Sequence, residues 1–147
     1  MNYIDSEHLQ NWIKSGQASV VSAEVCRDFH DVLLTFPWTP TRIDWGAVEH
    51  VTMDLDEVDN AAVAATARAR KAPLHTHVLV LFTPDQPGLV CRTEDALENL
   101  DHLYWKAPGA RYFCGADASK GRWEYHHHDF GEFDGIAKVT LRVQRSA

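Results

Sequence analysis

The sequence predicts a single α+β domain over residues 1–147, in which several helices pack on a mixed or antiparallel sheet. Three observations predict this fold class. Apolar residues recur at three- and four-residue spacing in several segments before residue 105, as they do in helices. The last third is dominated by the two-residue alternation of strands. The length suits one domain, and no linker or low-complexity tract divides it.

Two helices are predicted near the start of the chain. Ser6 can cap a short helix, and Gly16 can end it in a left-handed conformation. A second helix begins near Ser19 or Ser22 and carries apolar residues at helical spacing. It must end before Pro37, because proline cannot continue a helix. The aromatic, proline-rich residues that follow are expected to form a loop.

The middle of the chain alternates between strands and helices. Residues 51–55 have the period of a half-buried strand. Acidic residues at 56–59 precede an alanine-rich run that ends in basic residues, an arrangement that complements the dipole of a helix. Residues 78–82 are uniformly apolar, which is typical of a strand covered on both faces. With residues 89–91 they are expected to form a hairpin.

The last part of the chain predicts one more helix and then three strands. Thr93 can cap a helix that runs to Tyr104. Residues 111–114, 122–128 and 136–143 read as strands separated by turns. They predict a C-terminal three-strand antiparallel meander.

Composition limits the classes of function. The chain has 21 acidic and 14 basic residues, a formal net charge of −7, so nucleic acid and anionic membranes are repelled and a partner should be basic. The sequence shows neither a signal peptide nor an apolar run of the roughly 18 residues that a membrane span needs. We therefore expect a cytoplasmic protein. The absence of CxxC spacing predicts reduced, buried thiols at Cys26, Cys91 and Cys114.

Signatures of the common enzyme classes are absent. The sequence contains no serine nucleophile elbow, no phosphate-binding Gly-x-x-x-x-Gly-Lys loop and no dinucleotide fingerprint. We therefore expect binding rather than catalysis, with no cofactor.

Histidines offer an alternative, a small metal-dependent enzyme or ligand-binding domain. A strand over residues 122–128 would turn Glu124, His126 and His128 to one face, because strand side chains alternate. Another predicted strand carries a second His-x-His pair. Imidazole and carboxylate groups suit zinc, iron or manganese. The metal ligands would be His75, His77, His126 and His128. The simpler interpretation makes these histidines solvated strand residues and assigns no metal.

Acidic and aromatic residues alternate after the histidines, where a loop is expected. Interfaces favour aromatic side chains, and surrounding carboxylates steer a basic partner. A second acidic patch lies on the polar face of the helix predicted from Thr93. The predicted partner-binding residues are Asp129, Phe130, Glu132, Phe133 and Asp134 in the loop, with Glu94, Glu98 and Asp101 on the helix.

Two segments carry a resemblance to a known class of protein. They are the turn and strand at residues 83–90 leading into the helix of residues 94–104, and the loop of residues 129–135 leading into the last strand. With its small size and acidity, the chain resembles the immunity proteins of bacterial contact-dependent growth inhibition and related polymorphic toxin systems. The resemblance implies stoichiometric neutralisation of one cognate toxin domain, often a basic nuclease, by covering its active site or an adjacent surface. The oligomeric state stays open.

Overall fold

An antiparallel sheet forms the centre of the protein. The computed structural model describes residues 3–103, 111–134 and 138–143. In these ranges seven strands pair in the order β1-β4-β3-β5-β6-β7-β2. The strands are β1 (Ala18–Val21), β2 (His50–Asp54), β3 (His77–Leu81), β4 (Gly88–Arg92), β5 (Arg111–Ser119), β6 (Arg122–Asp134) and β7 (Lys138–Arg142). The α+β class, the β3–β4 hairpin and the β5–β6–β7 meander are confirmed.

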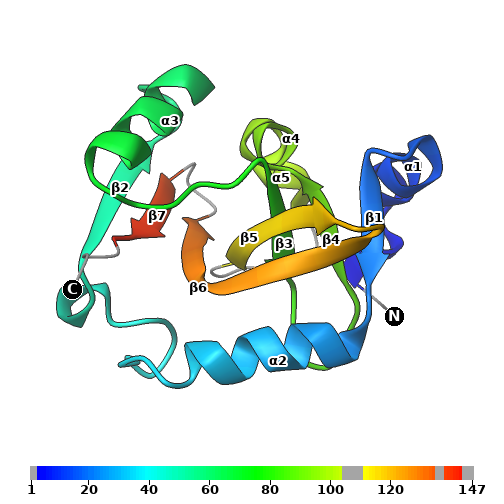
Figure 1. Cartoon of the computed structure of the whole chain (residues 1–147), viewed down its shortest axis with the longest axis horizontal. Coiled ribbons are helices and arrows are strands. Elements are labelled where there is room, and N and C mark those ends of the chain that lie inside the picture. The colour runs from blue at the N-terminus through cyan, green and yellow to red at the C-terminus, as the bar shows by residue number, and fades with distance from the viewer. Residues whose placement is uncertain (1–2, 104–110, 135–137, 144–147) are drawn as a thin grey trace.

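Helices cover both faces of the sheet. They are α1 (Glu7–Ser15), α2 (Ala23–Leu33), α3 (Asn60–Ala69), α4 (Thr93–Glu98) and α5 (Leu100–Leu103), with 3-10 turns η1 (Tyr3–Asp5) and η2 (Trp45–Ala47). Figure 1 shows α2 along one side of the sheet, with α1, α3, α4 and α5 on the other. The core accordingly has two apolar clusters, one under α2 and one under the remaining helices. None of the helices in the described ranges is long and apolar enough to cross a membrane.

The first two helices begin and end where their capping residues predict. The Ser6 side chain accepts a hydrogen bond from the Leu9 amide, and Gly16 ends α1 with φ of 83°. Ser22, rather than Ser19, caps α2. Ser19 lies in β1, an edge strand that the sequence interpretation missed because it is only four residues long.

The helix predicted from Thr93 to Tyr104 is wrong in two respects. It forms two short helices, α4 and α5, that are separated at Asn99. Thr93 is not the cap, because its buried hydroxyl donates to the carbonyl oxygen of His75 instead. Tyr104 lies outside the described residues.

The three cysteines are free and buried, as predicted. Burial, together with the nearby Asp95 carboxylate, raises the pKa of Cys91 to about 12. Burial also raises the pKa of Cys114. Thiols in such surroundings stay protonated at neutral pH and are poor nucleophiles.

Candidate functional site

The expected acid–aromatic loop does not form. Residues 129–134 are the second half of β6, and Phe130, Glu132 and Phe133 are each no more than 2% exposed. These three residues therefore cannot form the exposed docking face that the sequence predicted. Asp134 continues the strand opposite Lys138, and its side chain is not described. The error arose because the glycines near these residues were read as turn signals, whereas Gly131 pairs within the sheet.

Glu132 is buried because it fastens a loop to the sheet. Its carboxylate lies 2.8 Å from Arg42 Nη2 and accepts a hydrogen bond from the Trp45 indole. The neighbouring Tyr112 hydroxyl accepts a hydrogen bond from the Ile43 amide. Burial, with a further contribution from Glu132, raises the pKa of Tyr112 to about 12. These polar groups are therefore structural rather than available to a partner.

A bulge in β6 separates the histidines of the triplet. Pairing with β5 passes from Cys114 opposite Phe130 to Gly115 opposite His126, so the intervening residues of β6 have no counterpart on β5. The bulge breaks strand alternation. Consequently the predicted row of His126 and His128 on one face is wrong, and His128 is exposed with its ring 6.3 Å from that of Phe36.

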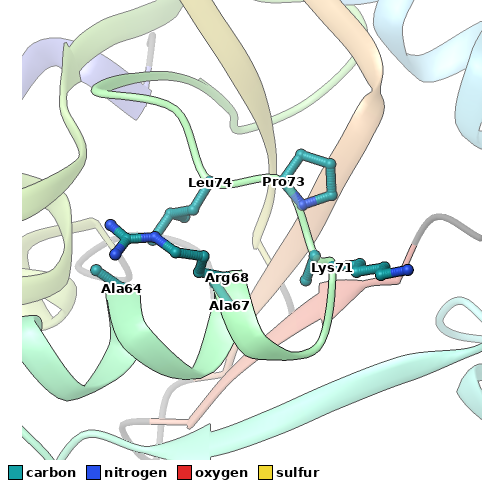
Figure 2. A pocket seen from close by; sticks show the side chains of 7 residues that line it. Ala64, Ala67, Arg68, Lys71, Pro73 and Leu74 are labelled. Atoms are coloured by element: carbon teal, nitrogen blue, oxygen red, sulfur yellow. The ribbon is translucent and has the colours of Figure 1, made fainter.

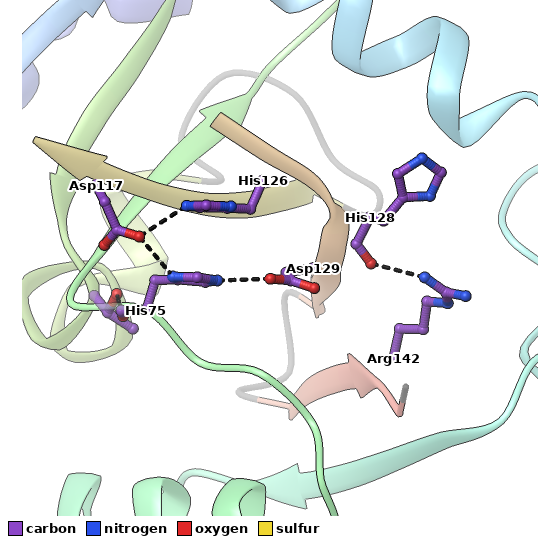
Figure 3. Close-up of polar contacts among 7 residues, drawn as sticks. His75, Asp117, His126, His128, Asp129 and Arg142 are labelled. Carbon is purple, nitrogen blue, oxygen red and sulfur yellow. Dashed lines mark hydrogen bonds and ion pairs between the residues drawn. The ribbon is translucent and has the colours of Figure 1, made fainter. Parts of the chain in front are cut away.

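Two histidines and two aspartates meet beside the bulge, and we call them the His–Asp cluster: His75, Asp117, His126 and Asp129. Asp117 Oδ2 lies 3.0 Å from His75 Nδ1 and 2.8 Å from His126 Nε2. Asp129 Oδ2 lies 2.7 Å from His75 Nε2. Figure 3 shows the contacts as a chain from Asp129 through His75 and Asp117 to His126. His75, His126 and Asp129 each offer one potential ligand atom, all within 4.8 Å of one another.

Gly115 provides the space in which His75 lies. A Cβ atom on this residue would come within 2.0 Å of His75 Cδ2. The His75 side chain is 19% exposed, and its ring stacks on that of His126 with centroids 4.4 Å apart and planes 4° apart. The Thr93 hydroxyl donates a hydrogen bond to the His75 carbonyl oxygen. Local packing therefore fixes the position of His75.

The two histidines of this cluster were predicted from the sequence as metal ligands, but its two aspartates were not. Of the four histidines in the metal alternative, His75 and His126 meet, whereas His77 lies beside Trp123, with centroids 5.0 Å apart. Asp117 was missed because it was assigned to a turn, although β5 extends to Ser119. Extending the alternation of β5 past Gly115 would have placed Asp117 on the same face as Gly115.

Acidic residues from two distant segments form an exposed surface. Glu94 and Glu98 lie exposed on α4. Glu98 accepts a hydrogen bond of 2.9 Å from the side chain of Asn60, the first residue of α3. Exposed acidic residues immediately precede Asn60. The α3–α4 acidic surface therefore comprises Asp56, Glu57, Asp59, Glu94 and Glu98. Asp101 lies in α5, but its side chain is not described.

A pocket of about 190 Å³ joins this acidic surface to the His–Asp cluster. Asn60 and Glu94 line it together with His75. Arg92 also lines it and lies 3.8 Å from Glu94. The two features are therefore neighbours on the same side of the sheet.

A second, open pocket of about 510 Å³ lies at the end of α3. Its lining includes Arg68 and Lys71. Figure 2 shows these two side chains extending in different directions, so they do not form a common anion site. The chain matches no protein-family model and no curated protein.

Proposed function

We propose that the chain is a stoichiometric binding protein that neutralises a cognate, basic toxin domain of the nuclease type. The observation that carries the proposal is the α3–α4 acidic surface, which joins carboxylates from two segments through the Asn60–Glu98 hydrogen bond. It replaces the buried residues of β6 as the expected contact. The net charge of −7 also favours a basic partner.

The physical basis is electrostatic complementarity. A nuclease presents lysine and arginine side chains to the phosphates of its substrate. Carboxylates on a binding protein are attracted to the same basic side chains. Opposite charges raise the rate of encounter and fix the orientation of the partners. A protein that covers such a surface inhibits without performing chemistry.

The acidic residues of α2 are a weaker candidate for the contact. The exposed carboxylates of this helix are Glu24, Asp28 and Asp31, and Arg27 lies among them, whereas the α3–α4 acidic surface has five carboxylates beside Arg92. The smaller number of carboxylates reduces the field of the α2 face. Because α2 lies on the opposite face of the sheet from α4, the two surfaces can be tested separately.

The proposal predicts a toxin gene immediately upstream of the gene for this chain, and the first experiment measures binding of the full chain to the C-terminal domain of that toxin. Titration calorimetry at low ionic strength, where charges are least screened, should show one chain bound per toxin domain. The toxin domain should also have no nuclease activity when it is in the complex. No binding under these conditions would contradict the proposal.

The second experiment locates the contact. Replacing Glu94 and Glu98 with glutamine should slow association by about threefold to tenfold and change dissociation less, since exposed charges act mainly on encounter. Glu24→Gln with Asp28→Asn is the matched control, because it removes two exposed charges at the same spacing from α2. Equal slowing by both pairs would show a general charge effect and would exclude α4 as the specific contact.

A further inference from the structure

We propose that His75, His126 and Asp129 bind one divalent transition-metal ion, with Asp117 orienting the two imidazoles. The site goes beyond the proposed partner binding and does not depend on it. It rests on the hydrogen-bond pattern of the His–Asp cluster, on the bulge that brings Asp129 to the cluster and on the space left by Gly115.

Asp117 selects the nitrogen that each histidine offers to a metal. Its Oδ2 atom accepts from His75 Nδ1 and from His126 Nε2. Each neutral imidazole carries one N–H, so with a metal ion bound these contacts would keep the N–H on His75 Nδ1 and His126 Nε2, and His75 Nε2 and His126 Nδ1 would be the ligand atoms. A carboxylate that holds the second nitrogen of a metal-binding histidine is a common outer-shell arrangement. Asp117 is therefore a positioning residue.

Asp129 supplies the third ligand from the bulge. Its Oδ2 atom lies at hydrogen-bond distance, 2.7 Å, from His75 Nε2. The metal ion would displace the proton that bridges these two atoms, and that proton would be released to solvent. The Asp129 side chain is 17% exposed and that of His75 is 19% exposed, so both ligands are partly shielded from water. Regular pairing of β6 would have placed Asp129 elsewhere, because the bulge shifts the strand at this point.

The stacked rings must separate when the ion binds. An imidazole nitrogen coordinates along a lone pair in the plane of its ring, and planes 4° apart at a centroid distance of 4.4 Å cannot both contain one ion. His126 is the ring that turns, because its side chain is 30% exposed, whereas His75 rests on Gly115. Zinc, iron and manganese suit two imidazoles and one carboxylate.

The test is a zinc titration of the untagged full chain, purified without a nickel column. Calorimetry should show one equivalent of zinc bound with a dissociation constant of about 1 µM or tighter, which corresponds to roughly 8 kcal/mol. The ring-proton signals of His75 and His126 should shift together in the NMR spectrum as their stacking is lost. Binding weaker than about 100 µM would contradict the proposal.

The run of histidines at residues 126–128 requires a control, since it could chelate zinc by itself. His75 lies outside this run, so His75→Ala should weaken binding at least about 100-fold only if the cluster is the site. His128→Ala should leave the affinity unchanged. Unchanged binding in His75→Ala, or loss of binding in His128→Ala, would assign the zinc to the histidine run and overturn the proposal.

Conservative variants separate ligation from folding. Asp129→Asn should remove binding, whereas Asp117→Asn should weaken it by about 10–100-fold, the usual cost of losing an outer-shell partner. Thermal unfolding with and without zinc checks that each variant folds, because an ion that binds the native state raises the unfolding temperature. Wild-type affinity in a folded Asp129→Asn variant would contradict the ligand set. Toxin binding is measured separately, so the two proposals can fail independently.

Discussion

At the scale of single residues, burial divides the carboxylates of β6 into structural and surface groups. Glu132 is 1% exposed and bonded to Arg42 and Trp45, whereas Glu124 on the same strand is exposed. The sequence could not make this distinction, because it depends on the loop that packs against the strand. Charge and residue type alone made both carboxylates candidates for an exposed site, Glu124 beside the histidines and Glu132 in the expected docking loop.

Glu132→Ala should lower the free energy of unfolding by about 2–3 kcal/mol, because it leaves the Trp45 indole N–H buried without its acceptor. Arg42 is 42% exposed and can turn to water, which limits the loss. Glu124→Ala is the control and should change the free energy by no more than about 0.5 kcal/mol. Urea unfolding measures both values. Equal effects would mean that Glu132 does not fasten the loop.

His127 should make stability depend on pH. Burial lowers its pKa, and the neighbouring His128 and His126 lower it further, while Asp28 opposes the shift. Between the unfolded pKa of about 6.5 and the lower folded pKa, the unfolded chain binds more protons than the folded chain. The contribution of His127 to the free energy of unfolding is therefore complete above about pH 6.5. It is lost as the pH falls from there through the lower folded pKa.

His127→Phe tests this dependence, because phenylalanine can keep the stacking on Phe29 and does not titrate. Urea unfolding at pH 7.5 and at pH 5.5 should show a smaller loss of stability for the variant than for the wild type. His30, whose pKa is also lowered by burial, contributes equally to both proteins. Identical losses would exclude His127 as a source of the dependence.

At the scale of elements, the sequence predicts what local chemistry determines. Serine caps and a left-handed glycine set the ends of α1 and the start of α2, so these positions were predicted correctly. The strands of the meander follow from alternation and turns. The bulge in β6 and the break at Asn99 could not be predicted, because they depend on register and packing between distant segments. The His–Asp cluster depends on that register, which explains why only its histidines were identified.

Gly115→Ala tests the link between β5 and the cluster. The added Cβ would come within 2.0 Å of His75, so His75 must move, and zinc affinity should fall at least about tenfold. Gly88→Ala is the control, since its Cβ would meet Val80 O at 2.5 Å on another pair of strands. Both variants should lose stability, but only Gly115→Ala should lose zinc affinity, measured by calorimetry. Unchanged affinity would mean that Gly115 does not position His75.

At the scale of the whole molecule, the sheet separates two surfaces with different charge. The α3–α4 acidic surface and the His–Asp cluster share one face and a common pocket. The opposite face is covered by α2, which carries fewer carboxylates, Glu24, Asp28 and Asp31, together with Arg27. This division predicts that a basic partner contacts one face only. It also explains why the total charge, read from the sequence, could indicate the kind of partner but not its position.

The most direct test of partner binding at the α3–α4 acidic surface is hydrogen–deuterium exchange of the full chain with and without the basic toxin domain. We expect slower exchange of backbone amides in residues 56–64 and in α4, with α2 unchanged, because a bound partner protects the amides that it covers. Protection of α2 without protection of α4, or no protection in a complex that forms, would contradict binding at this surface.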